Sequence, residues 1–453
     1  MKRRAYGKGL VILVTTLFFS LTMLPAIGTL KPITFQNREF EKERVSLQNY
    51  ELPPPIPVNM TLEESIFRRC SIRVFSDDPV TDEELSTVLW AAYGYINEEK
   101  RTVHGIEGIY AARIYVLKED AVYIYDPLNH SLIFYKEGDY RGRVAQYEAP
   151  IQLGIVWDKN KSSNENYAAA EIGEIGQNIY FMANALDLGT VTTVGFTLSR
   201  IGLPSNEVAK IIMPLGHPKY PYNFVYRPLV LSPLPRIQYS NMSLTTAIEE
   251  RRETDSFEGE LTKQEKTQVI WSTYGYSYFL DKTEDEFFYH INRHRTVPSA
   301  HGYYPLRIYA ITESGIYRYI PNIYDPIYGI LPLAFLPIPM PVFTFMMKVK
   351  GGDYREEIAQ ASLPSIASAP LSIISVLDIE RTRPKNFDDF SGEEYRWLWY
   401  YEAGASAYNV LLEATAWNLS ANVFPITNKE AILSVLGLDG NDFDPLFIVP
   451  VGK

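Results

Sequence analysis

Trp90-Ala-Ala-Tyr-Gly-Tyr95 and Trp271-Ser-Thr-Tyr-Gly-Tyr276 are two versions of one hexapeptide, and this repetition decides the fold. Further matching pairs follow outward from it, in the same order along the chain. Pairs in the same order indicate a tandem duplication. The repeat distance, from Met60 to Met242, is too long for a solenoid, so each copy is a domain. The other pairs are Met60–Ile66 with Met242–Ile248, Arg101–Val103 with Arg295–Val297, Arg113–Tyr115 with Arg307–Tyr309, Gly138–Arg141 with Gly352–Arg355, Ala149–Pro150 with Ala369–Pro370, and Met213–Gly216 with Val449–Gly452.

Each copy predicts helices and strands in an irregular order. A helix begins near Thr61 in the first copy and near Ser243 in the second, because both residues are good N-caps. Since no regular β-α-β-α rhythm appears, we predict an α+β fold. Further helices are expected over Thr81–Tyr93, Thr262–Tyr274, Ala168–Leu186 and Tyr395–Trp417, and strands over Arg113–Leu117, Ala121–Tyr125, Lys210–Gly216 and Leu446–Gly452.

The repeats also set the domain boundaries. The first domain covers residues 60–227, a Pro-rich linker covers 228–241, and the second domain covers 242–453. The second domain contains an apolar insertion at 320–350, whose four central prolines forbid a regular transmembrane helix. We expect its apolar residues 328–347 to contact the membrane, to cover a ligand pocket, or to pack as an ordinary hairpin.

The N-terminus directs the chain out of the cytoplasm. Cations in Lys2–Lys8 precede an apolar run from Leu10 to about Leu30, which predicts a signal peptide or an N-terminal membrane anchor over residues 1–30. Ala26 and Gly28 suit signal-peptidase cleavage, whereas the length of the run suits an uncleaved anchor. The basic segment also loosely resembles a twin-arginine signal. Residues 31–59 are polar and then Pro-rich, which is typical of a tether.

Composition and charge narrow the class of protein. The 453 residues are 46% hydrophobic and 21% charged, which is typical of a chain with a packed core. A net charge of −11 argues against nucleic acid as a partner, because a phosphate backbone is repelled. The single cysteine, Cys70, forms no intrachain disulfide, and we expect no metal site.

Several motifs in the first copy resemble those of the flavin-dependent nitroreductase superfamily, with the SagB-type dehydrogenases as the most similar branch. They are Arg69-Cys-Ser-Ile-Arg-Val-Phe75, Glu171-Ile-Gly173 leading to Gln177-Asn178, and Leu188–Phe196. The second copy adds Pro298-Ser-Ala-His-Gly302, which is similar to the Pro-Ser-Ala-Gly loop of the family. The branch's Lys-Tyr pair before the long helix is replaced by Asn166-Tyr167.

The resemblance implies FMN sites at a dimer interface, where one partner supplies the Arg-x-Ser-x-Arg motif and the other the Pro-Ser loop. The first copy keeps that motif and has lost the loop, which is Val103–Glu107. The second copy keeps the loop, but Glu253 and Asp255 replace the serine and the second arginine. Two carboxylates repel a phosphate dianion. We therefore expect an intramolecular pseudo-dimer of two nitroreductase-like domains with one composite FMN site.

The same resemblance implies a role for each motif residue. The motif in the first copy and Lys219 would bind the FMN phosphate and ribityl chain, and Asn178 would bind the polar edge of the ring. Val194 and Gly195 would bring a backbone N–H to the flavin N5, and the loop of the second copy would line the ring. His301 replaces the usual glycine of that loop and would contact substrate, donate a proton or only pack. The cofactor-binding candidates are thus Arg69, Ser71, Arg73, Asn178, Val194, Gly195, Lys219, Pro298, Ser299 and Ala300, and the catalytic candidate is His301.

Two functions follow as hypotheses. The first is an extracytoplasmic FMN-dependent oxidoreductase with a small-molecule, lipid-soluble or peptide electron partner, with residues 10–30 and 328–347 as the membrane-contacting segments. A single chain would be its functional unit. The second is a non-catalytic ligand-binding or scaffold protein that derives from the duplicated fold.

Overall fold

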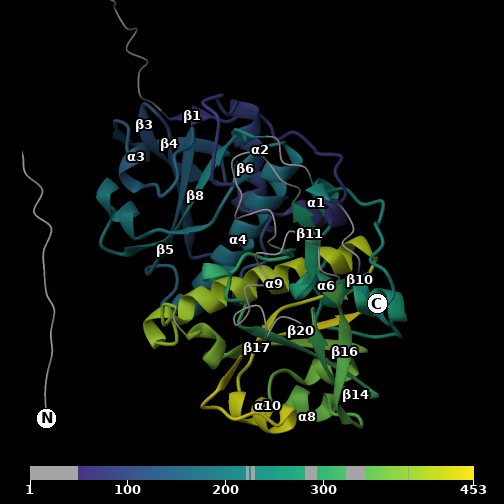
Figure 1. The fold of residues 1–453 in the computed structure, drawn as a ribbon. Coiled ribbons are helices and arrows are strands. Elements are labelled where there is room, and N and C mark those ends of the chain that lie inside the picture. Colours follow the sequence, from purple (N-terminus) through teal and green to yellow (C-terminus); the bar gives the residue numbers. More distant parts are fainter. Residues whose placement is uncertain (1–48, 221–223, 226–229, 281–292, 323–341, 386) are drawn as a thin grey trace, which may run out of the picture. The chain divides into compact units, whose positions relative to one another are not determined.

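Each copy of the repeat builds one antiparallel sheet and packs helices against it (Figure 1). The computed structural model describes residues 49–220, 224–225, 230–280, 293–322, 342–385 and 387–453. Both copies belong to one compact unit, Leu47–Lys453. The predicted α+β fold of two tandem domains is confirmed, and the predicted signal peptide or anchor at 1–30 lies outside the described residues.

The sheet of the first copy runs in the order β1-β4-β3-β2-β5-β8-β6, and β7 also pairs with β8. Its central strand β5 is buried along its whole length, because its side chains contact other elements on both faces. The strands are β1 (Tyr50–Glu51), β2 (Ala112–Leu117), β3 (Ala121–Asp126), β4 (Ser131–Glu137), β5 (Ile151–Asp158), β6 (Gly189–Thr190), β7 (Thr193–Val194) and β8 (Glu207–Gly216).

The sheet of the second copy repeats this plan in the order β16-β14-β13-β17-β20-β18, and β19 also pairs with β20. Its strands are β13 (Leu306–Thr312), β14 (Gly315–Ile320), β16 (Phe345–Gly351), β17 (Leu371–Asp378), β18 (Ser420–Ala421), β19 (Phe424–Pro425) and β20 (Phe443–Gly452). Two small sheets also occur among the described residues. They contain β9 (Phe224–Val225), β11 (Tyr276–Leu280) and β12 (Arg293–Arg295), and β10 (Val230–Leu231) with β15 (Val342–Phe343).

Side-chain caps fix the starts of the paired helices. Thr81 and Thr262 each form a capping box with the glutamate three residues later, which satisfies backbone N–H groups that the helix leaves free. The helices of the first copy are α1 (Leu62–Arg68), α2 (Asp82–Tyr93), α3 (Arg141–Val144) and α4 (Glu165–Ala185). Those of the second copy are α5 (Leu244–Glu249), α6 (Lys263–Tyr274), α8 (Arg355–Gln360), α9 (Arg396–Ala416) and α10 (Lys429–Leu436). The 3-10 helices are η1 (Ile106–Gly108), η2 (Phe196–Ile201), η3 (Ala300–Gly302), η5 (Pro364–Ser368), η6 (Ile379–Thr382) and η7 (Glu393–Tyr395).

Helices α4 and α9 join the two copies and are buried over most of their length. They cross closely at two glycines. A Cβ at Gly173 would overlap the backbone oxygen of Tyr401, and a Cβ at Gly404 would overlap that of Ala170. Because these positions correspond in the two repeats, the crossing is close to a twofold arrangement. The pair therefore forms the interface of an intramolecular pseudo-dimer.

The segments before α1 and α5 are also exchanged between the copies. Leu62 N donates to Met242 O at 3.1 Å, and Leu244 N donates to Met60 O at 2.8 Å. Val58 N reaches the hydroxyl of Thr245 at 3.0 Å, while Ser240 N reaches the carboxylate of Glu63 at 2.8 Å. Each copy thus holds the segment that leads into the other.

Residues 49–58, which the sequence predicts as the end of a tether, pack against the first copy. Strand β1 adds to the free edge of β4, and Leu52 and Val58 are buried. Of the apolar insertion at 320–350, residues 323–341 lie outside the described part, while 345–351 form β16. Within the described ranges, no helix is long and apolar enough to cross a bilayer.

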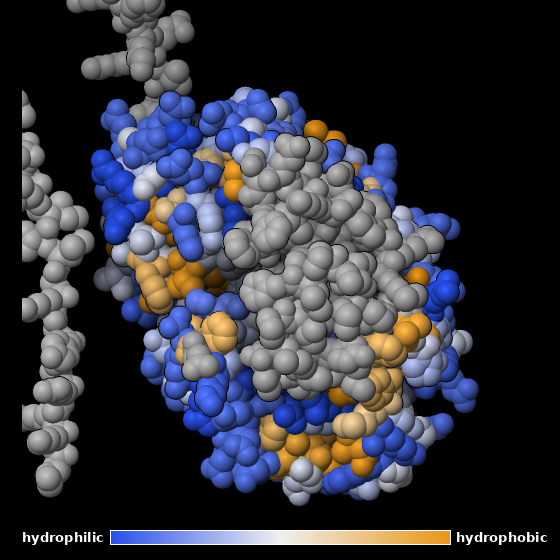
Figure 2. Space-filling model, viewed as in Figure 1, coloured by the Kyte–Doolittle hydropathy of each residue, from blue (hydrophilic) through white to orange (hydrophobic). Residues whose placement is uncertain are grey.

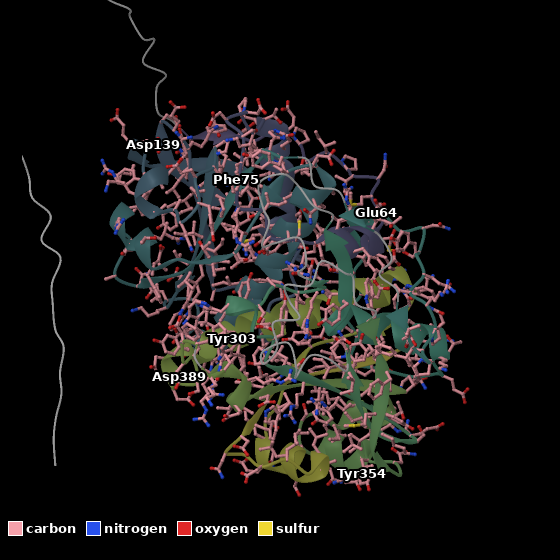
Figure 3. All side chains as sticks on the ribbon, viewed as in Figure 1. Glu64, Phe75, Asp139, Tyr303, Tyr354 and Asp389 are labelled. Carbon is pink, nitrogen blue, oxygen red and sulfur yellow. The ribbon has the colours of Figure 1, made fainter. Side chains whose placement is uncertain are left out.

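The surface of each copy carries polar and charged side chains. On the face shown in Figure 2, most of the described side chains are hydrophilic, and hydrophobic ones gather in limited areas. The repeated Gly-Asp-Tyr-Arg motif forms the same ion pair in both copies, Arg141 with Asp139 at 2.8 Å and Arg355 with Asp353 at 2.7 Å. Figure 3 shows Asp139 and Tyr354 of the two motifs far apart, each at the outer end of its own copy.

Candidate active site

Arg69 is the buried centre of the predicted phosphate motif. It caps the end of α1, and only 2% of the residue is exposed. Its Nε donates to the carbonyl of Arg295 in the second copy at 2.9 Å, and its guanidinium lies 5.1 Å from the ring of Tyr180. Its Nη1 is buried and finds no hydrogen-bond partner among the described residues. A buried cationic donor without an acceptor is costly, so this position suits an anionic oxygen.

The other predicted phosphate residues lie along the same segment. Ser71 Oγ is 3.2 Å from the hydroxyl of Tyr180, and Arg73 folds back to donate to the carbonyl of Ser71 at 3.2 Å. The backbone N–H of Lys219 donates to Val74 O at 3.1 Å, which brings the chain after β8 alongside the motif. The structure therefore gathers two arginines, a serine and the backbone of a lysine on one short segment.

The Pro-Ser loop of the second copy meets this motif across the domain junction. The bond from Arg69 to Arg295 O ends three residues before Pro298, which is buried. The Ser299 hydroxyl donates to Glu402 at 2.6 Å and accepts from Tyr304 N at 2.9 Å, so it supports the loop from within. Burial raises the pKa of Tyr304, and the charge of Arg69 partly offsets that rise. We call Arg69, Ser71, Arg73 and residues 298–301 the composite site.

Arg251, Glu253, Asp255 and residues 104–107 form the corresponding counterpart site. The guanidinium of Arg251 is bonded to other protein groups. Its Nε pairs with Glu253. Its Nη1 donates to Thr102 O at 2.5 Å, and its Nη2 donates to Arg101 O at 3.2 Å. Glu253 also pairs with Lys100 at 3.2 Å. Although burial raises the pKa of Glu253, these two cations hold it below its usual value.

The loop side of the counterpart site is also filled by polar contacts. His104 Nε2 lies 2.8 Å from Asn422 Oδ1, and the amide of Asn422 donates to Asp255 at 3.1 Å. Glu174 accepts from the backbone N–H groups of His104 and Gly105 at 2.8 and 3.0 Å. Burial raises the pKa of Glu174 to about 8 and lowers that of His104 to about 4. Acidic and amide groups thus line the position where the composite site has arginine and serine.

A sequence model of the nitroreductase family matches residues 66–217 and 258–453, which cover most of both copies. The chain belongs to the nitroreductase family. A Methanocaldococcus jannaschii protein assigned as a nitroreductase is 30% identical over 189 residues, which cover 37% of this chain and 96% of that protein.

Solved structures of nitroreductase-family proteins resemble the chain as well. One from Anabaena variabilis superposes with a TM-score of 0.60 and 15% identity over 89% of this chain and 94% of its own, so the shared fold extends over both copies. Another, from Desulfovibrio desulfuricans, was solved with FMN. It has a TM-score of 0.26 and 22% identity over 34% of this chain and 85% of its own.

Two residues that the nitroreductase resemblance assigns to the flavin, Asn178 and Gly195, form hydrogen bonds with protein groups. Asn178 is fully buried on α4, and its amide nitrogen donates to Ala91 O at 2.7 Å and lies 2.9 Å from the hydroxyl of Tyr408. Asn409 occupies the same place on α9 and donates to Ser272 O at 2.9 Å. Both asparagines join helices at the junction through their amide nitrogens, but Asn178 Oδ1 is buried and has no hydrogen-bond partner among the described residues, so the predicted ring contact of Asn178 stays a prediction.

The predicted contact of the Gly195 N–H with the flavin N5 is wrong, because that N–H is bonded within the protein. Gly195 N donates to Lys210 O at 2.8 Å and extends the pairing of β7 with β8, so this N–H is not available to a flavin. Val194 is 39% exposed at the end of β7. The loop therefore keeps Val194 as its outward-facing residue, while Gly195 anchors it.

His301 lies at the outer end of the Pro-Ser-Ala-His loop, and Ala300 beside it is half-buried. Its backbone φ is +53°, a left-handed conformation that favours glycine. The exposed imidazole stacks on Phe390 at 4.7 Å with an interplanar angle of 28°. Its neighbour Tyr303, labelled in Figure 3, donates to Asp388 O at 3.0 Å. The structure thus shows the packing role of His301 and leaves its imidazole open to solvent.

Three functional candidates escaped the sequence comparison with the family. Tyr180 accepts from Thr192 N at 2.8 Å, and Thr192 Oγ1 lies 2.9 Å from the hydroxyl of Tyr401 in the second copy. Tyr180 and Tyr401 lie outside the family motifs, and Thr192 lies within the Leu188–Phe196 motif, which gives no sign of its contact with Tyr401. Their signal lies in the comparison of the two copies, where all three positions differ.

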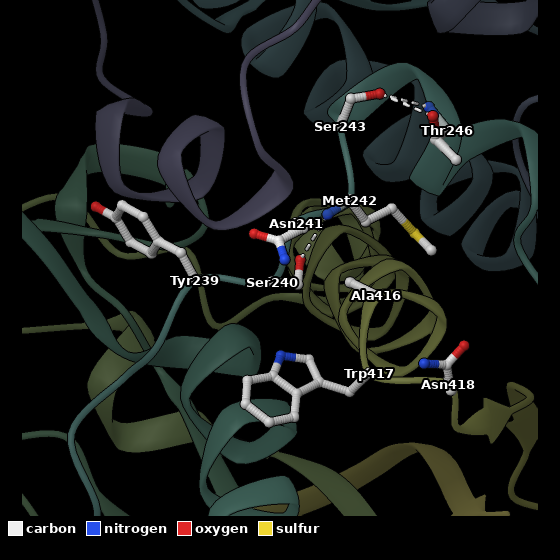
Figure 4. Close-up of a pocket in the computed structure, with 9 residues that line it drawn as sticks. All are labelled: Tyr239, Ser240, Asn241, Met242, Ser243, Thr246, Ala416, Trp417 and Asn418. Atoms are coloured by element: carbon white, nitrogen blue, oxygen red, sulfur yellow. Dashed lines mark hydrogen bonds between the residues drawn. The ribbon is translucent and has the colours of Figure 1, made fainter.

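A separate pocket of about 620 Å³ opens where the linker meets the end of α9 (Figure 4). None of the predicted site residues lines it, so it is distinct from the composite site. Its lining consists of Tyr239, Ser240, Asn241, Met242, Ser243, Thr246, Ala416, Trp417 and Asn418.

Proposed function

We propose that the chain is an FMN-dependent oxidoreductase with one flavin, bound at the composite site between its two copies. The observation that carries this proposal is the buried Nη1 of Arg69, which has no partner among the described residues. The corresponding Arg251 is fully engaged by protein groups. A phosphate oxygen would supply the acceptor that Arg69 lacks.

The residues of the composite site suit the polar end of FMN. Arg69 and Arg73 would bind its phosphate, with Lys219 as the third cation and Ser71 as a hydroxyl toward the ribityl chain. On the other side, Pro298 and Ala300 would present backbone and small side chains to the ring. When bound, the flavin supplies the electron transfer, while the protein positions it and excludes water.

The charges at the two sites also favour phosphate binding at the composite site. The composite site has Ser71 and Arg73 where the counterpart site has Glu253 and Asp255, as the aligned repeats show. Each of these two carboxylates near a phosphate dianion would weaken its binding. We therefore propose one flavin per chain, and a single chain as the functional unit.

The substrate side and the location are proposals that the sequence supports. The motifs favour the SagB-type dehydrogenase branch, whereas the lost Lys-Tyr pair favours a substrate other than an azoline. The basic and apolar N-terminal segment and the apolar residues 328–347 support an extracytoplasmic, membrane-associated enzyme. Its electron partner would then be a small molecule, a lipid-soluble carrier or a peptide. Fractionation of cells that make the full chain tests the location, and recovery in the cytoplasm contradicts it.

The central experiment is a measurement of flavin content. The full chain should copurify with flavin, or take up added FMN, at one per chain by visible absorbance. Arg73→Asp imitates Asp255 and should abolish binding, whereas Arg252→Asp is the matched control, because it makes the same charge change at an exposed site in the second copy. Colourless protein that FMN cannot reconstitute would contradict the proposal and favour the scaffold hypothesis.

A further inference from the structure

Thr192 is held on two sides by tyrosines from different copies. Its backbone N–H donates to the hydroxyl of Tyr180 on α4 at 2.8 Å. Its own hydroxyl lies 2.9 Å from that of Tyr401 on α9. Tyr180 is 1% exposed and Tyr401 is 6% exposed, so both phenol groups need partners inside the protein. The backbone and the side chain of one residue are therefore fixed at once.

This arrangement connects the phosphate motif of the composite site with the segment that leads into β7. The hydroxyl of Tyr180 lies 3.2 Å from Ser71 Oγ, and its ring faces the guanidinium of Arg69 at 5.1 Å. Thr192 directly precedes β7, whose last residue is the outward-facing Val194. A displacement of Tyr180 would therefore move the phosphate motif and the loop together.

The counterpart half of the molecule lacks all three groups. Helices α4 and α9 align residue for residue, and so do the short strands that follow them. Tyr180, Thr192 and Tyr401 correspond to Leu411, Val423 and Ala170, none of which carries a side-chain hydrogen-bonding group. The polar arrangement thus occurs only beside the intact phosphate motif.

Steric fit points in the same direction. A Cβ at Gly176 would overlap the hydroxyl of Tyr401, so glycine leaves the space that this hydroxyl occupies. The corresponding residue in the second copy is Ala407. Both the added phenol and the space for it are therefore found on one side of the pseudo-dimer.

We propose that Tyr180, Thr192 and Tyr401 form a positioning clamp that holds residues 192–195 against the flavin ring. The clamp rests on the proposed function, because it acts on the flavin of the composite site. Its three members are positioning residues, since they hold the loop and do not themselves carry out chemistry. Through Tyr401, the second copy would control the geometry of a loop that belongs to the first.

Binding of two flavins separates the clamp from the phosphate motif. Thr192→Val imitates Val423, and Tyr401→Phe removes only a hydroxyl. Each should weaken the binding of FMN and of riboflavin about ten-fold, because a single buried hydrogen bond is lost at the ring end. Arg73→Asp should weaken FMN far more than riboflavin, because riboflavin has no phosphate. Tyr400→Phe is the matched control on α9, since its hydroxyl is bonded by Lys429 at 3.2 Å, and it should leave both affinities unchanged.

The outcomes are distinguishable from a failure of the proposed function. If the unmodified chain binds neither flavin, the proposed function fails and the clamp fails with it. If it binds both, and Thr192→Val and Tyr401→Phe bind them as tightly as the unmodified chain, the clamp is refuted while the function stands. Thermal unfolding without flavin shows which variants are folded, and Tyr401→Phe decides the matter if Thr192→Val does not fold.

Discussion

The composite site and the counterpart site begin from the same backbone and differ in how their first arginine is satisfied. Arg69 keeps a buried donor that meets no acceptor among the described residues, whereas Arg251 is bonded to Glu253 and two backbone carbonyls. A buried guanidinium nitrogen without a partner costs free energy, which an anionic oxygen at Arg69 would offset. The two sites therefore differ in how the protein itself satisfies the first arginine, and the proposed function rests on this difference.

What the two sites share teaches as much as what separates them. Glu171 accepts from the hydroxyl of Tyr93 at 2.5 Å, and Glu402 is bonded in the same way by Tyr274. Burial raises the pKa of both carboxyls to about 7. Since this pair is equal in a site that would bind flavin and in one that would not, it belongs to the fold. Residues that differ between the sites are better functional candidates.

The largest effect is expected on the free energy of unfolding, from substitutions at the crossing of α4 and α9, where the two copies are most alike. Gly173→Ala and Gly404→Ala each place a Cβ against backbone of the other helix, which cannot move away without shifting the whole crossing. Each should lower the free energy of unfolding by about 3 kcal/mol or more. Denaturation by urea measures this loss, and Gly142→Ala serves as the control, because a Cβ there meets no neighbour. Equal stability of the three variants would show that the crossing is looser than described.

The next effect separates the two arginines. Arg69→Gln removes the charge that would face phosphate and should weaken FMN binding about 100-fold, because a charge-assisted hydrogen bond is lost. Arg251→Gln should leave FMN affinity unchanged but lower the free energy of unfolding by about 3 kcal/mol, because Glu253 loses its buried partner. Titration with FMN and urea denaturation of both variants check this. An equal loss of FMN affinity in the two variants would contradict the proposed difference between Arg69 and Arg251.

A smaller effect depends on pH and concerns Glu174. Burial raises its pKa to about 8, so the folded protein retains a proton that the unfolded chain releases near the usual value of 4.5. The stability that this group contributes is therefore complete below about pH 4.5 and is lost as the pH rises through 8. Glu174→Gln should gain about 4 kcal/mol over the unmodified chain at pH 9 relative to pH 5. Urea denaturation at both values measures the gain, and the exposed Glu357→Gln should show none.

The repeats made the fold and the division of labour predictable. Paired motifs identify two domains, because a duplicated sequence retains its local propensities and its apolar pattern. They also predict that Arg69 and the Pro298 loop meet, which the bond to Arg295 supports. Sequence could not show that the N–H of Gly195 is used by the protein itself, because its partner, the carbonyl of Lys210, comes from another element.

Contacts between the copies were the hardest to predict. Thr192 and Tyr401 lie far apart along the chain and meet only because α4 and α9 cross. Family motifs describe one copy at a time, so the Leu188–Phe196 motif contains Thr192 but does not show its partner across the junction. A direct alignment of the two copies would have marked Tyr180, because Leu411 stands in its place. Asymmetry between repeats is thus a usable signal for such residues.

The smallest expected effect is no change at all, and it sharpens the comparison most. Glu253→Ser with Asp255→Arg rebuilds the Arg-x-Ser-x-Arg motif in the second copy, yet the stoichiometry should remain one FMN per chain. Arg251 would be released from Glu253, but its Nη1 and Nη2 would still be held by backbone carbonyls. Glu174 would remain buried in the site, and His104 would still replace the proline of the partnering loop. The flavin content of the double variant measures the outcome. A second bound FMN would show that the Arg-x-Ser-x-Arg motif alone decides which site binds flavin.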